Sequence, residues 1–236
     1  MKIIIFTNQT THHTKFVMDI ISKYPNTKVV QENTSLKAPF DTYHVFQSQQ
    51  ETYERDFFFD GKDIQIVNIV STLRVENIND LKTEKLIKLF SPDIILVFGT
   101  SRINRKIIGL MPGRILNLHG GNPTNYRGLD SHLWAIYHGH FDELVTSIHL
   151  VEPELDTGNL IDLRPLDLKA KMQFYQLRAE NTKCCIGLAL NAVNEYESTK
   201  NFKFMNSGQK GRYYSFMPSV LKELCVKKFN QFTENI

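Results

Sequence analysis

The sequence predicts an α/β fold in which a mostly parallel, Rossmann-like sheet carries helices on both faces, followed by a small C-terminal hairpin segment. Short apolar runs alternate with segments of helical period as far as about residue 140, the order typical of parallel strands joined by crossover helices. The run "DIILVFG" (93–99) is apolar throughout, as expected for a central strand covered on both faces. A chain of 236 residues that is 42% hydrophobic can bury one such core.

The first half of the chain supplies most of the predicted parallel strands. "KIIIF" (2–6) is a continuous apolar strand, and the residues after it have the spacing of one apolar helix face, with Phe16, Val17, Ile20, Ile21 and Tyr24. Residues 32–60 have no clear period, although "QSQQETYERDFFF" within them is compatible with a helix. The other elements predicted here are strands at 27–31, 63–70, 93–99 and 114–118 and helices at 81–90 and 104–111.

The second half begins with a predicted helix, "GLDSHLWAIYHG" (128–139), which Gly139 ends. Strands at 143–151 and 159–168 and a long helix from about 170 to 198 follow. In the tail, the aromatic segments "FKFM" and "GRYYSFM" flank "NSGQKG", a pattern that predicts a hairpin. We therefore expect a main domain over residues 1–200 and a C-terminal hairpin and tail over 201–236.

Composition argues against several classes of protein, among them nucleic-acid-binding, membrane-spanning and disulfide-rich proteins. The net charge is +3 and no long Lys/Arg run is present, so we expect no nucleic-acid partner. The sequence has neither an apolar run of membrane-spanning length nor the features of a signal peptide at "MKIIIFTNQT". The three cysteines are Cys184, Cys185 and Cys225, a spacing that indicates neither a disulfide framework nor a zinc cluster. These features predict a cytoplasmic protein without a membrane partner.

An amide and an imidazole stand together where the strand "RILNL" (114–118) ends. Asn117 and His119 lie two residues apart at the carboxyl end of a predicted central strand, the edge at which parallel α/β sheets bind ligands. The following "HGG" also occurs in esterase oxyanion holes, but the chain has no G-x-S-x-G nucleophile turn. The first strand–helix turn, "FTNQTTHH", lacks both the dinucleotide fingerprint and a P-loop.

The other histidines do not indicate a metal site. His138 and His140 are spaced H-x-H and His12 and His13 are adjacent, but no H-E-x-x-H or Cys/His cluster accompanies them. We place His138 and His140 at a solvated helix end. For His12 and His13, a loop position and a ligand contact both remain open.

Asp156 is the third candidate residue. It lies in "VEPELDTGNLI", a turn-forming stretch between two predicted strands. Taken alone, Asn117, His119 and Asp156 each have an ordinary structural interpretation as a strand-end cap, a loop residue and an Asx-turn former. Their combination favours a functional site.

The segments "NLHGGNPTNYRG" and "ELDTGNLI" resemble the folate-dependent formyltransferase family, most closely its sugar-nucleotide N-formyltransferases. The likeness covers roughly residues 93–163 in detail and the α/β core more loosely. It implies that Asn117, His119 and Asp156 are the catalytic residues and that 10-formyltetrahydrofolate is the formyl donor. Two departures are visible: Gly120, Gly121, Asn122 and Pro123 replace the family's frequent Ser-Leu-Leu-Pro, and the phosphate loop of the purine enzyme is absent.

The resemblance also implies where the donor binds and what the three residues do. Formyl transfer to an amine passes through an oxyanion, which Asn117 and His119 can stabilise, each such donor contributing about 10²–10³ in rate. Asp156 can accept the proton of the amine, directly or through water, and can orient His119. The residues implied to contact the folate are Gly99, Ser101, Arg102, Ile103, Asn104, Val151 and Leu155.

The identity of the molecule that accepts the formyl group follows less directly from the sequence. A methionyl-tRNA enzyme is expected to carry a C-terminal RNA-binding domain, and a phosphoribosylglycinamide enzyme needs the missing phosphate loop. We therefore expect a nucleotide-linked amino sugar, most simply a dTDP-4-amino-deoxy sugar used for a surface polysaccharide, with the other two acceptors as alternatives. Contacts to this substrate are expected from Asn122, Tyr126, Arg127 and Trp134, with Lys15 as a second cation for a diphosphate; Trp134 is equally well interpreted as a core residue.

Two further hypotheses concern the whole chain. A non-catalytic module that binds folate or sugar nucleotide would be expected to lack one of the three residues, and all three are present. The aromatic tail is too small to bury its own side chains. It therefore either packs on the core, where it can cover the substrate, or contacts a second copy, and we favour a homodimer.

Overall fold

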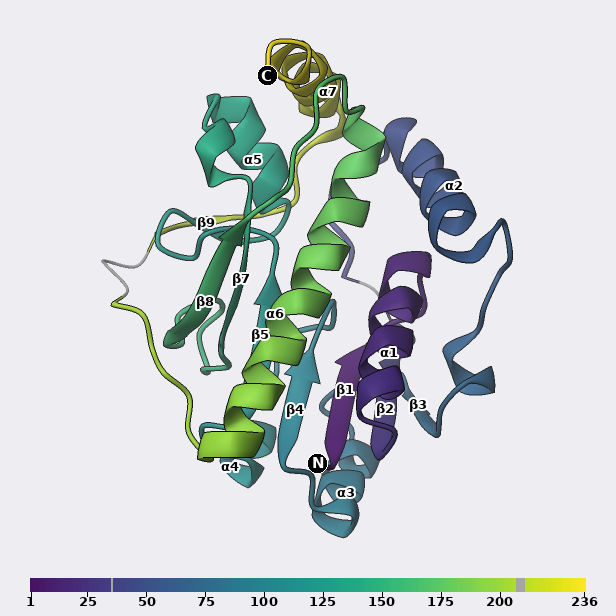
Figure 1. Cartoon of the computed structure of the whole chain (residues 1–236), viewed down its shortest axis with the longest axis vertical. Coiled ribbons are helices and arrows are strands. Elements are labelled where there is room, and N and C mark those ends of the chain that lie inside the picture. The colour runs from purple at the N-terminus through teal and green to yellow at the C-terminus, as the bar shows by residue number, and fades with distance from the viewer. Residues whose placement is uncertain (35, 207–210) are drawn as a thin grey trace.

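The computed structural model describes residues 1–34, 36–206 and 211–236, and a seven-stranded sheet of order β3-β2-β1-β4-β5-β7-β8 forms its centre (Figure 1). The five strands from β3 to β5 are parallel, whereas β7 and β8 are antiparallel to their neighbours. The mostly parallel sheet was therefore predicted correctly. Its strands are β1 (Ile3–Thr7), β2 (Thr27–Glu32), β3 (Thr72–Val75), β4 (Ile94–Val97), β5 (Ile115–His119), β7 (Val145–Leu150) and β8 (Leu160–Pro165).

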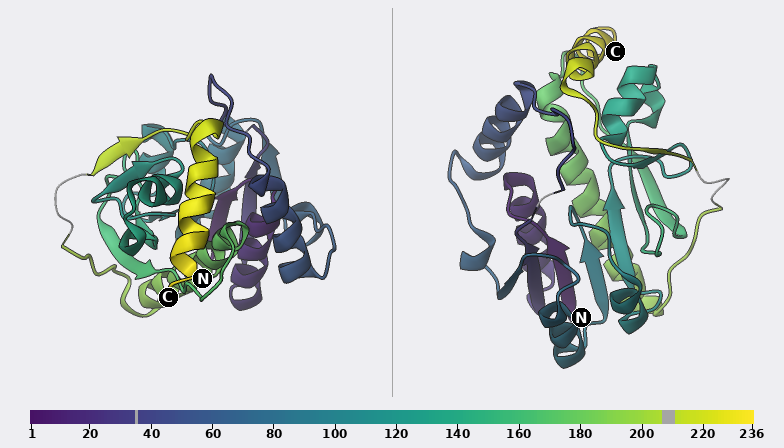
Figure 2. Two further views of the ribbon diagram at one scale, coloured as in Figure 1. Left: turned by 90° about the horizontal axis from the view of Figure 1, so that it is seen from above. Right: turned by 180° about the vertical axis from the view of Figure 1, so that it is seen from behind.

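Helices cover both faces of the sheet. On one face, α1 (Thr11–Lys23) and α6 (Leu177–Thr199) lie side by side, and on the other α3 (Leu81–Phe90) packs beside α4 (Arg105–Leu110) (Figures 1 and 2). The remaining helical elements are α2 (Phe46–Phe59), α5 (Ser131–His138), α7 (Ser219–Thr233) and the short 3-10 turns η1 (Ile66–Asn68), η2 (Phe141–Glu143) and η3 (Phe174–Gln176). Two short strands, β6 (Tyr126–Gly128) and β9 (Arg212–Tyr214), form a separate ribbon.

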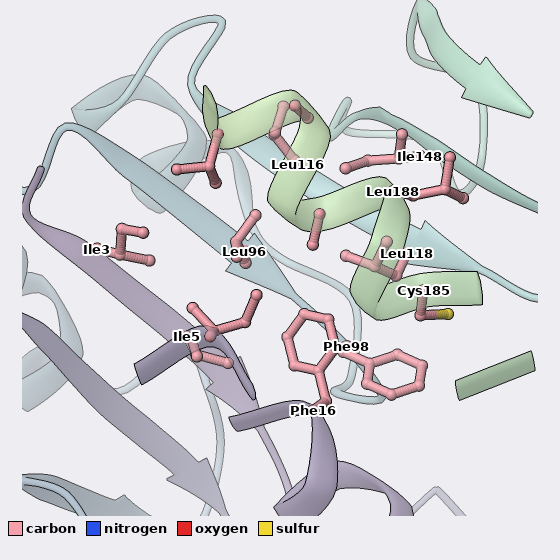
Figure 3. Packing of buried hydrophobic residues seen from close by; sticks show 14 of the residues in the cluster. Ile3, Ile5, Phe16, Leu96, Phe98, Leu116, Leu118, Ile148, Cys185 and Leu188 are labelled. Carbon is pink, nitrogen blue, oxygen red and sulfur yellow. The ribbon is translucent and has the colours of Figure 1, made fainter. Parts of the chain in front are cut away.

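The central strands are apolar on both sides because both sides are covered. In β1, Ile3 and Ile5 face the cluster under α1 and α6, while Ile4 and Phe6 face the cluster over α3 and α4. Figure 3 shows the first of these clusters, in which side chains of β1, β4 and β5 meet those of α1 and α6. Burial on both faces explains why these strands lack a polar–apolar alternation.

One predicted strand was misplaced. Residues 63–70 were expected to pair in the sheet, but the structure forms η1 there and starts β3 at Thr72. The side chain of Gln9 holds the segment by accepting from the backbone N–H of Ile66 and donating to the carbonyl of Ile64. Ile66 packs into the core below α1, so the apolar residues here fill a crossover connection.

The tail also differs from the expectation. Residues 202–206 form no strand, and β9 pairs with β6 in parallel, so these segments do not form the predicted hairpin. Residues 207–210 of the expected turn lie outside the described residues. The chain then forms α7, which was not predicted although Cys225, Phe229 and Thr233 recur at helical spacing on its buried face. The long helix begins at Leu177, preceded by η3, rather than near residue 170.

The carboxyl ends of the parallel strands point toward α5 and α7 (Figure 1). These two helices share a third hydrophobic cluster with Phe46 of α2 and Phe174 of η3. Additional elements thus gather at the edge of the sheet where a ligand is expected. Among the described residues, none of the helices combines the length and apolar character needed to cross a membrane.

Candidate active site

Strand β5 carries Asn117 and His119 on one face of the sheet. Leu116 and Leu118 point into the cluster below α1 and α6, so the alternation of a strand turns Asn117 and His119 to the opposite face. His119 is buried, with 7% of its surface exposed. The adjacent amide and imidazole predicted from the sequence therefore share one face at the carboxyl end of a central strand.

A second histidine, which the sequence analysis did not identify, faces Asn117. His149 of β7 is directly opposite Asn117 in the antiparallel register, and its Nε2 lies 3.3 Å from Asn117 Nδ2. Its Nδ1 donates to the carbonyl of Leu150 over 2.8 Å. This bond fixes the ring, so that Nε2 is the nitrogen turned toward the site.

Asp156 closes the group from the loop after β7. Its Oδ1 lies 3.4 Å from both Asn117 Nδ2 and His149 Nε2, and its Oδ2 lies 3.7 Å from His119 Nδ1. The backbone N–H of Gly128 donates to the same Oδ2 over 2.7 Å. Burial on its own would raise the pKa of Asp156, but His119, His149 and the Gly128 N–H together hold it below the usual range. Asp156 is therefore an anion at neutral pH.

The ring of His119 is oriented by the chain that follows it. Nε2 donates to the carbonyl of Tyr126 over 2.9 Å, and Ser131 Oγ lies 3.4 Å from the same nitrogen. Nδ1 is consequently the nitrogen that faces Asp156. A charged Asp156 beside Nδ1 gives a protonated imidazole an anionic partner.

A cleft of about 480 Å³ opens on this group from the side of β4. The loop after β4 and the loop after β7 form its walls, and the guanidinium of Arg102 donates to the carbonyl of Pro153 to join them. Of the residues expected to contact the folate, the cleft is lined by Gly99, Ser101, Arg102, Ile103, Val151 and Leu155. Asn104 is not among the lining residues; its side chain caps α4 by accepting from the N–H of Ile107.

The loop after β4 is held by buried groups. Glu32 accepts from the N–H of Ser101 over 2.7 Å and from its hydroxyl over 2.6 Å. Gly99 has a φ of +80°, and a Cβ there would collide with the ring of His13. His12 and His13 thus lie buried in the first turn of α1, behind the cleft, and burial lowers the pKa of each.

A second cavity, of about 320 Å³, adjoins the first. The two share His119, Gly120, Gly128 and Leu129 in their walls. Apart from His119 of β5, the polar side chains of the second cavity come from α2, from α5 and the residue before it, and from α6 and α7; they include those of Gln50, Asp130, Arg178, Asn181 and Lys222. His119 therefore lies where two cavities meet that are lined by side chains from different elements.

The residues predicted to contact an amino-sugar substrate line neither cavity, among the residues that the structure describes. The hydroxyl of Tyr126 bonds to His140, Arg127 donates to the carbonyl of Gly211, and Trp134 donates to that of Ser215. Asn122 accepts from Thr124 within its own turn. These four residues instead fix the β6–β9 ribbon and its connections, and Lys15 pairs with Asp19 on α1.

His138 and His140 are exposed at the end of α5, as expected. Within residues 1–34, 36–206 and 211–236, no group of three or more His, Cys, Asp or Glu side chains is arranged to hold a metal ion. His149 could have been identified from the sequence as a histidine inside the predicted strand at residues 143–151.

Comparison with known proteins gives one structural and two sequence relatives of note. The formyltransferase PseJ from Anoxybacillus kamchatkensis, solved with UDP-4,6-dideoxy-4-formamido-L-AltNAc and tetrahydrofolate, superposes with a TM-score of 0.54 at 18% identity, covering 91% of this chain and 86% of that one. At this identity the likeness shows the fold.

Two curated relatives match parts of the sequence. Phosphoribosylglycinamide formyltransferase from Escherichia coli is 33% identical over 90 residues, which cover 38% of this chain and 39% of that one. Methionyl-tRNA formyltransferase from Finegoldia magna is 26% identical over 129 residues, 54% of this chain and 41% of that one. The matched segments span about two fifths of the length of each of these relatives.

The family assignment comes from a broader match. The family model described as formyl transferase matches residues 1–178, which include Asn117, His119 and Asp156 and the two loops around the larger cleft. This match covers most of the chain, and the chain belongs to the formyl transferase family.

Proposed function

We propose that this protein is an N-formyltransferase that moves the formyl group of 10-formyltetrahydrofolate to the amine of a nucleotide-linked amino sugar. One observation carries the proposal: Asn117, His119 and Asp156 converge where two separate cavities meet. A transfer between two substrates needs such a meeting point, because the donor and the acceptor must approach the same groups from different sides.

The larger cleft suits the folate. Its walls combine the apolar side chains of Phe98, Ile103 and Leu155 with the backbone of the loop at residues 99–102, a mixture suited to a flat heterocycle with polar edges. The smaller cavity, whose charged lining residues are Asp130, Arg178 and Lys222, is left for the acceptor. The folate supplies an activated formyl group next to His119.

The three side chains then have distinct tasks. Negative charge develops on the formyl oxygen as the amine attacks, and the amide of Asn117 and the imidazole of His119 stabilise it. The attacking nitrogen must lose a proton, and Asp156, which remains ionised at neutral pH, accepts it directly or through a water molecule. The bond between the formyl carbon and N10 of the folate then breaks, and N10 takes up a proton as tetrahydrofolate leaves. The contacts of Asn117 Nδ2 with Asp156 Oδ1 and of His119 Nδ1 with Asp156 Oδ2, at 3.4 and 3.7 Å, are long for hydrogen bonds, so a reacting group can compete for Asn117 Nδ2, His119 Nδ1 and Asp156 Oδ1.

The amino-sugar acceptor is supported by the fold of PseJ, which was solved with a nucleotide sugar and tetrahydrofolate. A phosphoribosylglycinamide acceptor is the second candidate, because the E. coli relative shares 33% identity over 90 residues. Both acceptors carry an amine and a phosphate. They differ in the sugar and in the nucleotide.

A panel assay tests the proposal. The purified chain is incubated with 10-formyltetrahydrofolate and, in separate reactions, UDP- and dTDP-linked amino sugars, glycinamide ribotide and charged initiator tRNA. We expect tetrahydrofolate release only with an amino sugar. Turnover on glycinamide ribotide or on tRNA alone would show that this molecule, and not an amino sugar, is the acceptor. If none of the acceptors in the panel causes release of tetrahydrofolate, the proposal is contradicted.

A further inference from the structure

The C-terminal helix α7 forms part of the wall of the smaller cavity, although it lies beyond residues 1–178, where the family match ends. Lys222 is the residue of α7 in that wall, and it shares the cavity with His119. Part of the proposed acceptor site is therefore built from a segment outside the family model. Such a segment is well placed to distinguish one acceptor from another.

The helix is fastened on both sides of the cavity. At its start, Ser219 Oγ donates to Asp41 Oδ2 over 2.7 Å, and His44 Nε2 lies 3.1 Å from Glu223 Oε2. These contacts join α7 to the segment that leads into α2. Cys225 packs in the cluster shared with α5, so the position of α7 is fixed relative to the cavity.

Lys222 is an unusual residue in this setting because only 3% of its surface is exposed. Nζ donates to the carbonyl of Thr42 over 2.6 Å, and the nearest carboxylate oxygen, Asp130 Oδ2, is 4.0 Å away. An ammonium group has three donors, and this carboxylate is too distant for a hydrogen bond. Burial lowers the pKa of Lys222 even with Asp130 and Asp41 nearby. Among the described residues Nζ makes one hydrogen bond, to Thr42, so its other donors are available to an anion.

The other cation of the cavity is already paired. Arg178 donates from Nε and Nη2 to the two oxygens of Glu54, over 2.6 and 2.7 Å. Glu54 is fully buried, and this bidentate pair balances the charge of the guanidinium. Of the two cations, Lys222 is therefore the one left to bind an incoming anion.

We propose that Lys222 binds the diphosphate oxygens of the acceptor and so determines which amine substrate reaches His119. This inference rests on the proposed function for the identity of the cavity. An anion at Nζ would supply the bonds that Thr42 and Asp130 leave unmade. The amine end of the same molecule would then extend toward His119 along the cavity.

Calorimetric titration without folate tests the inference independently of formyl transfer. The probes are inorganic pyrophosphate, UDP and dTDP, with uridine and thymidine as ligands that lack phosphate. We expect the three phosphate ligands to bind the wild type, and Lys222→Met to weaken each by roughly tenfold to a hundredfold, as for loss of a charge-assisted hydrogen bond. The matched control, Lys227→Met, removes an exposed charge from the same helix and should bind as the wild type does.

A second variant covers the case in which Lys222→Met does not fold. Asp130→Asn keeps an acceptor for the backbone N–H of Met217, which now donates to Asp130 Oδ2, but removes the competing negative charge. It should tighten pyrophosphate binding by about threefold or more. The inference is overturned if the wild type binds none of the phosphate ligands, if Lys222→Met binds them normally, or if Asp130→Asn does not bind more tightly. If no acceptor in the panel is formylated but phosphate ligands still bind in a way that depends on Lys222, the proposed formyl transfer is refuted and the role of Lys222 in binding phosphate is not.

Discussion

Asn117 and His149 face each other across β5 and β7, with 3.3 Å between Asn117 Nδ2 and His149 Nε2. The direction of the amide is thus set by a neighbouring strand as well as by its own. Because Nδ1 of His149 donates to the carbonyl of Leu150, the ring cannot turn away without losing a bond. We infer that His149 positions Asn117 and Asp156 for the proposed reaction.

Replacing His149 tests this positioning role. His149→Phe should lower kcat by about tenfold to a hundredfold, because small displacements of the reacting groups are costly, while KM for the folate stays close to that of the wild type. His149→Gln offers an oxygen to Asn117 and should recover part of kcat. A role in packing alone would instead reduce the melting temperature of both variants and leave the kcat of the folded protein unchanged.

Gly128 connects the β6–β9 ribbon to the site. Its φ is +96°, a Cβ there would collide with the carbonyl of Tyr214, and its N–H donates to Asp156. Gly128→Ala should therefore lower the free energy of unfolding by more than the roughly 1–3 kcal/mol expected for backbone strain alone. Gly139→Ala is the matched control, because Gly139 has a φ of +79° and open space around it.

Urea denaturation of the two variants measures the difference. Gly128→Ala should lose more stability than Gly139→Ala, and only Gly128→Ala should lose activity. Equal losses of stability would show that the close contact between β6 and β9 contributes nothing.

The main sheet and the three proposed catalytic residues were predictable because their signals are local. The apolar run at residues 93–99 identifies a central strand, and the position of Asn117 and His119 at the end of the next strand follows from the order of the chain. Asp156 could be added through the resemblance. Each of these inferences needs only the sequence around the residue.

The features that the sequence did not predict depend on pairing between segments that are far apart in the chain. The tail was expected to fold on itself, but β9 pairs with β6, more than 80 residues earlier (Arg212 beside Tyr126). The bonds of Tyr126 to His140 and of Trp134 to Ser215 likewise could not be read from the sequence, and a substrate contact by either residue stays a prediction. The pairing of His149 with Asn117 needs the strand register, which the sequence does not give.

Histidines whose pKa is lowered in the folded state predict that stability declines in mild acid. Burial lowers the pKa of His132 to about 4, and its Nε2 donates to the carbonyl of Val145. In the unfolded chain this group titrates near 6.5. As the pH falls from about 6.5 to about 4, the unfolded state binds a proton that the folded state does not, which destabilises the fold by up to roughly 3 kcal/mol.

His132→Gln checks this dependence, because glutamine can still donate to Val145. Urea unfolding at about pH 7.5 and about pH 5 should show a smaller loss of stability in the variant than in the wild type. Some loss should remain, since burial also lowers the pKa of His12 and His13. Identical losses in the two proteins would rule out His132 as a source of acid sensitivity.

We also predict a homodimer. Phe204 and Met205 expose 48% and 46% of their surface on the segment that bonds to the edge strand β8 through Met205 N and Leu160 O. Light scattering at micromolar concentration should give the mass of two chains, and the double substitution Phe204→Ser and Met205→Ser should give that of one. Leu89→Ser, at an exposed position on α3, is the control and should remain dimeric. A monomeric wild type would contradict the prediction.

The most direct test of the account is the rate of formyl transfer by Asn117→Ala compared with the wild type, measured in a single turnover with the acceptor that the panel assay identifies. The amide of Asn117 is proposed to act on the charge that develops during the reaction, so its loss should slow transfer by at least about a hundredfold. Folate binding and the melting temperature should change little. Transfer by Asn117→Ala at the wild-type rate would contradict the proposed active site.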